Sequence, residues 1–271
     1  MDITGFALVT GAGSGIGRAC AKTFAQDGAA GVALLDLNEQ ALQEVKTEID
    51  NDHAKRGDRS CIVEVYPVDV TDEVAVETVV KKIVAKFGRL DYAVNAAGVA
   101  FKHEGGAAFA QTKDWQKVLD VNLNGTFYVL RSAAQTMLKQ DPILSSVDGR
   151  PLQRGVIVNF GSILAHVGVA TSTAYTASKH AVMGLTRTAS EDYAKDGLRI
   201  NAICPGYIET PMTTNDPLLA KAMAAQVPTA VPMKRQGRPQ EVADGVMYLC
   251  GGRSSFVTGT ALFVDGGYTQ R

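Results

Sequence analysis

The stretch Thr10-Gly11-Ala12-Gly13-Ser14-Gly15-Ile16-Gly17 decides the fold of this chain, because it joins an expected strand to an expected helix. Glycines at such a turn let the backbone approach a pyrophosphate, and the N–H groups that open the helix attract its negative charge. The alternative interpretation is a tight turn that binds nothing. We interpret the stretch as a dinucleotide site, and its expected contacts are Gly11, Ser14, Gly15, Ile16 and Gly17.

Outward from this turn, short apolar or β-branched runs alternate with longer segments of helical period. Strands are expected at Phe6 to Thr10, Val32 to Asp36, Cys61 to Tyr66, Leu90 to Asn95, Val156 to Phe160, Arg199 to Cys204 and Ala261 to Val264. Helices are expected at Ile16 to Gln26, Glu39 to Ile49, Val74 to Phe87, Asn122 to Leu138, Ala174 to Ala194 and Pro239 to Cys250. The alternation predicts an α/β fold, a single-domain Rossmann-like doubly wound parallel sheet of about seven strands, order 3-2-1-4-5-6-7, with helices on both faces.

Length and composition are those of an ordinary globular protein. The 271 residues carry 27 Lys plus Arg against 28 Asp plus Glu, which argues against a nucleic-acid or membrane partner. The four cysteines are scattered without a C-x-x-C pair, so we expect neither a metal site nor disulfides. The first five residues lack a basic segment, and no apolar stretch approaches membrane-spanning length, so we expect a cytoplasmic protein of one domain over residues 1–271.

Two irregular segments interrupt the alternation. Asp141 to Arg154 leads from a helix into a strand, so we expect a structural insertion at the edge opposite the ligand-binding edge. Pro205 to Gly237 follows the carboxyl end of a strand and suits a lid over a ligand. Apolar lid residues suggest a lipophilic or bulky substrate, although they could equally pack the lid on the core; they are Met212, Leu218, Leu219, Met223, Val227 and Met233.

Asp36 ends the second expected strand, 19 residues after Gly17. An acidic residue near this spacing accepts hydrogen bonds from an adenosine ribose. Because a carboxylate repels a 2′-phosphate, Asp36 favours NAD over NADP. The alternative is that Asp36 caps the helix that follows.

Ser162, Tyr175 and Lys179 form the expected catalytic set. Tyr175 and Lys179 are four residues apart, so they project from one helix face, where an ammonium favours a phenolate and lowers the pKa of the phenol. Ser162 lies just past a strand's carboxyl end, where its hydroxyl could bind a substrate oxygen. Tyr and Lys at this spacing are also common on half-exposed helices, and each residue alone is uninformative.

Together these residues resemble the short-chain dehydrogenase/reductase family over nearly the whole chain. The cofactor turn of that family matches Thr10, Gly11, Gly15 and Gly17; its adenine-binding pair matches Asp69 and Val70; its N-A-G stretch appears as Asn95-Ala96-Ala97-Gly98. Its four catalytic positions match Asn122, Ser162, Tyr175 and Lys179, and its nicotinamide segment matches Pro205, Gly206 and Thr210, with Ile208 between them. Phe160-Gly161 and the long 141–154 insertion depart from the usual pattern.

The resemblance implies roles for the four catalytic positions. Tyr175 would be the acid/base, Lys179 would lower its pKa and bind the nicotinamide ribose, and Ser162 would orient the substrate oxygen. Asn122 would hold a water that relays protons, unless it only caps or bends a helix. The resemblance also implies a homodimer or homotetramer assembled through the helices at 122–138 and 174–194, and a small-molecule secondary alcohol or ketone as substrate.

Other interpretations remain open from the sequence. The chain could be an NADP-dependent carbonyl reductase, a cofactor-binding regulator or scaffold without chemistry, or a methyltransferase on a similar sheet. His166 lies between Ser162 and Tyr175 and is a candidate substrate contact. Trp115 lies in an expected amphipathic helix, which favours a place in the core.

Overall fold

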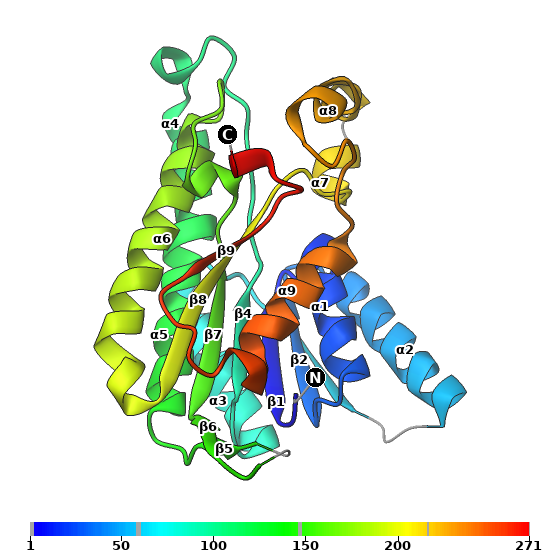
Figure 1. Cartoon of the computed structure of the whole chain (residues 1–271), viewed down its shortest axis with the longest axis vertical. Helices are drawn as coiled ribbons and strands as arrows, with labels where there is room; N and C mark the ends of the chain where they lie inside the picture. Colours follow the sequence, from blue (N-terminus) through cyan, green and yellow to red (C-terminus); the bar gives the residue numbers. More distant parts are fainter. Residues whose placement is uncertain (1–2, 58–60, 146–147, 216, 271) are drawn as a thin grey trace.

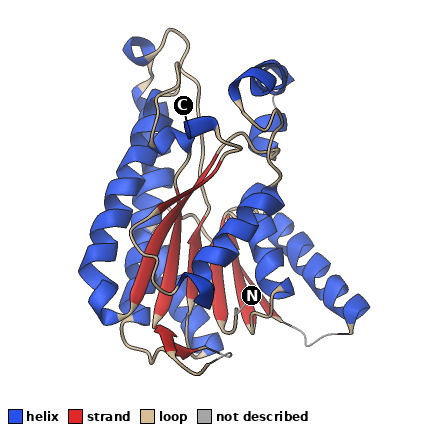
Figure 2. Ribbon diagram, in the orientation of Figure 1, coloured by secondary structure: helices blue, strands red, loops and turns tan. Residues whose placement is uncertain are grey.

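The computed structural model of the chain describes residues 3–57, 61–145, 148–215 and 217–270. Its main sheet has seven parallel strands in the order β3-β2-β1-β4-β7-β8-β9. Their bounds are β1 Phe6–Thr10, β2 Gly31–Asp36, β3 Ile62–Pro67, β4 Tyr92–Asn95, β7 Gly155–Phe160, β8 Leu198–Pro205 and β9 Ala261–Val264. Counted within this sheet, the order is 3-2-1-4-5-6-7, and helices cover both faces (Figure 2), so the predicted fold class is confirmed.

Each face of the sheet packs against three helices (Figure 1). One face contacts α1 (Gly15–Gln26), α2 (Glu39–Arg56) and α9 (Pro239–Cys250); the other contacts α3 (Glu73–Phe87), α5 (Thr126–Met137) and α6 (Thr173–Tyr193). Successive strand residues point to opposite faces, so Leu8 and Val9 of β1 enter different core clusters. A parallel strand buried on both sides must be apolar along its whole length, which explains the continuous apolar runs in the sequence.

Two helices differ from the sequence expectation. Helix α2 continues past Ile49 to Arg56 and ends where Gly57 takes a left-handed φ of 66°. The helix expected to begin at Asn122 instead begins at Thr112 as α4 (Thr112–Leu119), passes through a π-helical segment η2 (Asp120–Gly125) and continues as α5. Asn122 lies inside this π-helical segment and makes tertiary contacts, described below, that no helical period reveals.

The two irregular segments lie at opposite edges of the sheet (Figure 1). The 141–154 insertion forms a short antiparallel hairpin of β5 (Ile143–Leu144) and β6 (Pro151–Gln153) at the amino ends of the parallel strands. At the carboxyl ends, the segment after β8 forms α7 (Pro211–Thr214) and α8 (Pro217–Ala230). Within the described ranges, none of the helices has the length and apolar character needed to cross a membrane.

Candidate active site

The glycine-rich turn lies at the carboxyl end of β1, between the ends of β2 and β4. Gly11 and Gly15 have left-handed φ values of 65° and 53°, which other residues rarely adopt. A Cβ on Gly17 would lie 2.1 Å from the carbonyl oxygen of Gly11, so only glycine fits this turn. Ser14, directly before α1, is exposed and its hydroxyl makes no capping bond, which leaves the start of the helix open to a ligand.

Asp36 is held at the rim of this turn rather than at the start of α2. Its Oδ2 accepts a hydrogen bond from Gly13 N at 3.1 Å, and its Oδ1 accepts one from Asn38 N at 3.1 Å. The cap of α2 is Asn38, whose Oδ1 accepts from Ala41 N at 3.1 Å. The alternative reading of Asp36 as the helix cap is therefore wrong, and its carboxylate lies beside the expected dinucleotide site.

The segment after β8 closes the site from the other side. A Cβ on Gly15 would lie 3.5 Å from Cβ of Thr210, so the two expected cofactor segments face each other across a narrow gap. Pro205 ends β8, and a Cβ on Gly206 would lie 2.7 Å from Cα of Asp265, which requires glycine there. Ile208 is 4% exposed and pairs with Gly237.

The remaining expected cofactor residues lie at the end of β4 or follow β3 and β4. Thr10 Oγ1 accepts from Ala97 N at 3.1 Å, which fastens the Asn95 to Gly98 stretch to the glycine turn. Asn95 donates to Asn159 at 2.9 Å, whereas its own buried Oδ1 finds no partner in the described ranges. A Cβ on Gly98 would lie 3.8 Å from Lys179 Nζ, so glycine keeps the space before this ammonium clear.

Asp69 and Val70 lie in the turn before α3. The Asp69 carboxylate accepts from the backbone N of Thr71 at 2.9 Å and from its hydroxyl at 2.8 Å. Val70 is buried against Gly125 of the π-helical segment. This turn therefore follows the end of β3 and packs against the π-helical segment that carries Asn122.

Ser162, Tyr175 and Lys179 come together at the carboxyl end of β7. Ser162 lies two residues past this strand and is hydrogen-bonded to Tyr175, the third residue of α6. Lys179 lies one turn further along α6, where its Nζ donates to the carbonyl of Phe160 at 2.7 Å. The same Nζ lies 5.4 Å from the centroid of the Tyr175 ring. The arrangement can present a phenol and a hydroxyl to one substrate oxygen.

Burial dominates the electrostatics of this group. Burial raises the pKa of Tyr175, and the hydrogen bond from Ser162 lowers it by a smaller amount. The pKa of Tyr175 therefore shifts upward, opposite to the lowering that we expected from Lys179. The cost of removing the phenolate from water exceeds the stabilisation of the phenolate by the Ser162 hydrogen bond. Burial also lowers the pKa of Lys179 to about 8. At neutral pH the phenol is therefore protonated and the ammonium remains mostly charged.

Asn122 links the loop after β4 to α6. Its Oδ1 accepts from Val99 N at 2.8 Å, and its Nδ2 donates to Val99 O at 2.9 Å and to Ser178 Oγ at 3.1 Å. Ser178 is fully buried and donates to the carbonyl of Tyr175 at 2.7 Å. The backbone carbonyl of Asn122 accepts from Thr126 Oγ1 at 2.7 Å, consistent with the widened π turn.

Both amide hydrogens of Asn122 are thus used within the protein. Ser178 was missed by sequence reasoning, although its place directly before Lys179 in the Tyr-x-x-x-Lys spacing was the available signal.

The other candidate residues have mixed positions. His166 is exposed, and its ring meets Phe263 edge-on with centroids 5.7 Å apart. Trp115 is half-buried in α4. In the lid, Met223 and Val227 are buried.

Packing of the lid therefore accounts for part of its apolar character. Met212 and Met233 are exposed by 48% and 66%, so these two remain available to a ligand. The side chains of Leu218 and Leu219 lie outside the described part of the chain.

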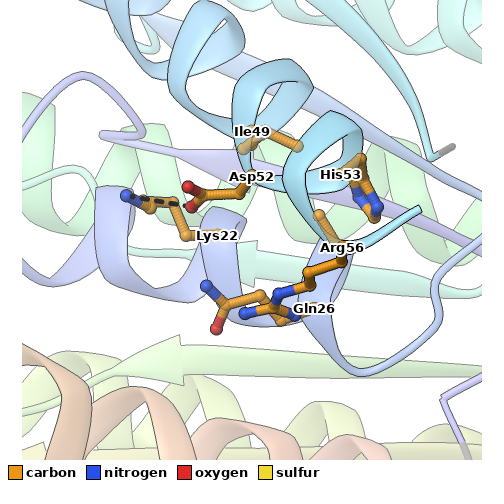
Figure 3. Close-up of a pocket in the computed structure, with 7 residues that line it drawn as sticks. Lys22, Gln26, Ile49, Asp52, His53 and Arg56 are labelled. Carbon is orange, nitrogen blue, oxygen red and sulfur yellow. Dashed lines mark ion pairs between the residues drawn. The ribbon is translucent and has the colours of Figure 1, made fainter. Parts of the chain in front are cut away.

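A small pocket lies between α1 and α2 (Figure 3). Its lining residues belong to the second half of each helix, whereas the glycine turn precedes α1. Lys22 and Asp52 form an ion pair of 3.7 Å across the pocket, and the buried Nδ1 of His53 has no partner among the residues that the structure describes. Its volume is about 10 Å³, which is room for one water molecule. This pocket is therefore too small for a substrate or a nucleotide. In the described ranges, no group of three His, Cys, Asp or Glu side chains is arranged to hold a metal ion.

Known proteins match this chain in sequence and in fold over nearly its whole length. A family model described as enoyl-(acyl carrier protein) reductase matches residues 11–269. The chain is 39% identical to the short-chain dehydrogenase fogB of Aspergillus ruber, over 99% of this chain and 98% of that relative. It is 36% identical to cyclohexanol dehydrogenase of Acinetobacter sp., over 98% of this chain and 95% of the relative.

Among solved structures, a short-chain type dehydrogenase/reductase from Mycobacterium marinum has a TM-score of 0.86 to this fold. It is 30% identical in sequence, and the match covers 100% of this chain and 98% of that one.

Proposed function

Because the chain belongs to the short-chain dehydrogenase/reductase family, we propose that it is an NAD-dependent oxidoreductase that interconverts a secondary alcohol and a ketone. The observation that carries the proposal is the convergence of Ser162, Tyr175 and Lys179 beside the glycine turn at the carboxyl edge of the sheet. The family is one of oxidoreductases that use NAD or NADP, so the choice of NAD rests on Asp36.

The residues around the turn fit a nicotinamide dinucleotide. The glycines leave the backbone of the turn open at the start of α1, and the Asp36 carboxylate at its rim suits a ribose diol. Thr210 faces Gly15 from the segment after β8, where it would hold the nicotinamide end. When bound, the cofactor supplies or accepts the hydride.

The residues of the chain would handle the proton. Tyr175, protonated at neutral pH, would donate its phenolic proton to the carbonyl oxygen during reduction, and Ser162 would orient that oxygen. Lys179 would bind the nicotinamide ribose and stabilise the phenolate that remains. Because the pKa of Tyr175 is raised, alcohol oxidation, which requires the phenolate, should accelerate as the pH increases.

The remaining parts of the proposal concern the whole chain. We assign residues 1–271 to one catalytic domain with a lid at about 205–237. Homodimers or homotetramers would form through α5 and α6, and the protein would work in the cytoplasm. The exposed Met212 and Met233 support a lipophilic or bulky substrate.

Titration of the purified protein with NADH and with NADPH, followed by cofactor fluorescence, tests the proposal. We expect tighter binding of NADH. A screen of secondary alcohols and ketones at 340 nm would then begin with cyclohexanol, the substrate in the name of one relative. Binding of neither cofactor would refute the proposal.

A further inference from the structure

A second lysine lies at the same end of α6 as the proposed catalytic tyrosine. Lys102 belongs to the loop that follows β4, at the carboxyl edge of the sheet. Its Nζ donates to Oγ of Ser172 at 2.8 Å. Ser172 is 4% exposed, lies directly before α6 and precedes Tyr175 by three residues. The bond to Ser172 therefore holds the Lys102 ammonium at the end of α6 that carries the phenol.

The loop that carries Lys102 is fastened to the segment before α6. The backbone N of His103 donates to the carbonyl of Thr171 at 2.8 Å, and Gly106 N donates to the carbonyl of His103 at 3.0 Å. Thr171 has a left-handed φ of 64°, which a β-branched residue adopts only when its surroundings hold it there. His103 is 4% exposed, and its buried Nε2 has no partner within the described part of the chain. Hydrogen bonds between the two loops therefore fix the position of Lys102.

No protein anion neutralises this ammonium in the described ranges. Burial lowers the pKa of Lys102, and no nearby carboxylate opposes this shift. The first turn of α6 contains no acidic residue, and the Ser172 hydroxyl caps no backbone N–H. An ammonium has three hydrogens to donate, and Ser172 accepts one of them. Two donors and the positive charge of this exposed side chain thus remain beside Ser172, at the end of α6 that carries Tyr175.

We propose that Lys102 determines substrate specificity by binding a carboxylate of the substrate, while Tyr175 and Ser162 act on its carbonyl or alcohol oxygen. This inference rests on the proposed function and narrows its substrates to oxo acids and hydroxy acids. The carboxylate accepts the two remaining hydrogens of the ammonium, and a charge-assisted bond of this kind in a partly desolvated site is stronger than one between neutral groups. A neutral substrate leaves the ammonium without this partner.

The test uses two unreactive probes of nearly the same shape, cyclohexanecarboxylate and cyclohexanecarboxamide. Their affinities for the full-length protein saturated with NADH are measured by calorimetry, in the wild type and in Lys102→Gln, Lys102→Arg and Lys113→Gln. Lys113 is an exposed lysine of α4 and serves as the matched control for loss of a positive charge. The quantity compared is the ratio of the two affinities.

We expect the wild type and Lys113→Gln to prefer the carboxylate at least tenfold, Lys102→Gln to lose about tenfold or more of this ratio, and Lys102→Arg to retain most of it. A wild type without preference for the carboxylate overturns the inference, as does an equal loss of both affinities in Lys102→Gln, which indicates a purely structural lysine. Failure to bind NADH at all would instead count against the proposed function.

Discussion

The two edges of the parallel sheet both bury polar and charged side chains, yet they use them differently. At the amino edge, the Asp91 side chain is completely buried and accepts hydrogen bonds from Phe6 N at 2.9 Å and Arg89 Nε at 2.7 Å. Gln140 donates to the carbonyls of Leu90 and Arg154, each at 2.6 Å. These groups bind one another, close the ends of the strands and attach the 141–154 insertion to the sheet.

At the carboxyl edge, some polar side chains keep hydrogen-bond donors or acceptors that no other described residue uses. Lys179 is 4% exposed and donates to the Phe160 carbonyl. Among the described residues, the buried Oδ1 of Asn95 has no partner, and the exposed Lys102 ammonium is bonded to the Ser172 hydroxyl without a counter-ion. Buried polar groups are normally satisfied, so unused donors and acceptors indicate where a ligand completes them. The amino edge also holds one such group, the buried Nε2 of Gln153, which has no partner in the part of the chain that the structure describes. The comparison therefore teaches a narrower difference: Asp91 and Gln140 bond to neighbouring groups of the fold, whereas the proposed site lies at the edge where Asn95 and Lys102 can still accept or donate hydrogen bonds.

The strongest test of this contrast is Tyr175→Phe. Loss of the phenolic proton should lower kcat by about 10³-fold, since positioned acid/base groups contribute about 10² to 10⁴. Affinity for the cofactor and the free energy of unfolding should remain close to those of the wild type. Steady-state rates and fluorescence titration measure these quantities, with the half-exposed Tyr248→Phe on α9 as the control. If Tyr175→Phe retained wild-type rates, Tyr175 would not be the acid/base of the reaction.

The second prediction concerns the cost of burying Lys179. The folded chain releases this proton near pH 8 and the unfolded chain near pH 10.5, so the folded state binds fewer protons between these values. The contribution of Lys179 to the free energy of unfolding therefore rises by about 3 kcal/mol from pH 8 to pH 10.5. Lys179→Met should remove this rise.

Urea unfolding at pH 7.5 and pH 10 measures the difference in the free energy of unfolding between the wild type and Lys179→Met. The variant should be more stable than the wild type at pH 7.5, with the gap narrowing at pH 10. An identical pH dependence in both proteins would contradict the assigned burial cost.

At the amino edge, Asp91→Ala should act on stability alone. Phe6 N and the Arg89 guanidinium lose their acceptor, which lowers the free energy of unfolding by about 2 kcal/mol. Denaturant midpoints measure this loss, and kcat at 25 °C should change less than twofold. A large loss of kcat in the folded variant would contradict the view that the amino edge of the sheet supports stability alone.

The smallest expected effect belongs to Asp36→Ala. Removal of the carboxylate takes an acceptor from the ribose and a repulsive charge from a 2′-phosphate, so the preference for NAD over NADP should fall about tenfold, or ~1.4 kcal/mol. The ratio of kcat/KM with the two cofactors measures it. An unchanged ratio would show that Asp36 only orders the turn through Gly13 and Asn38.

The sequence predicts most of the architecture because its signals are local. The bounds of β1 agree with the expectation residue for residue, and the glycine turn and Asp36 lie where strand-to-helix spacing places them. The Tyr175 and Lys179 pair follows from helical period alone. The end of α2 at Gly57 was missed, although the glycine was visible, because a polar surface helix has a weak apolar period.

Other features depend on contacts between segments far apart in the chain. The π turn at Asn122 is stabilised by bonds to Val99 and Ser178, which lie 23 and 56 residues away. The hydrogen bond from Lys102 to Ser172 joins residues that are 70 apart in the chain, and neither residue belongs to a sequence motif that predicts it.

The sequence by itself thus determined the order of strands and helices, the glycine turn and the spacing of the side chains proposed to be catalytic, since periodicity and turn chemistry act within a few residues. Only the tertiary structure decided how deeply those side chains are buried, and with it the raised pKa of Tyr175 and the lowered pKa of Lys179. Desolvation depends on everything that surrounds a group, and the neighbours that remove water come from several distant parts of the chain.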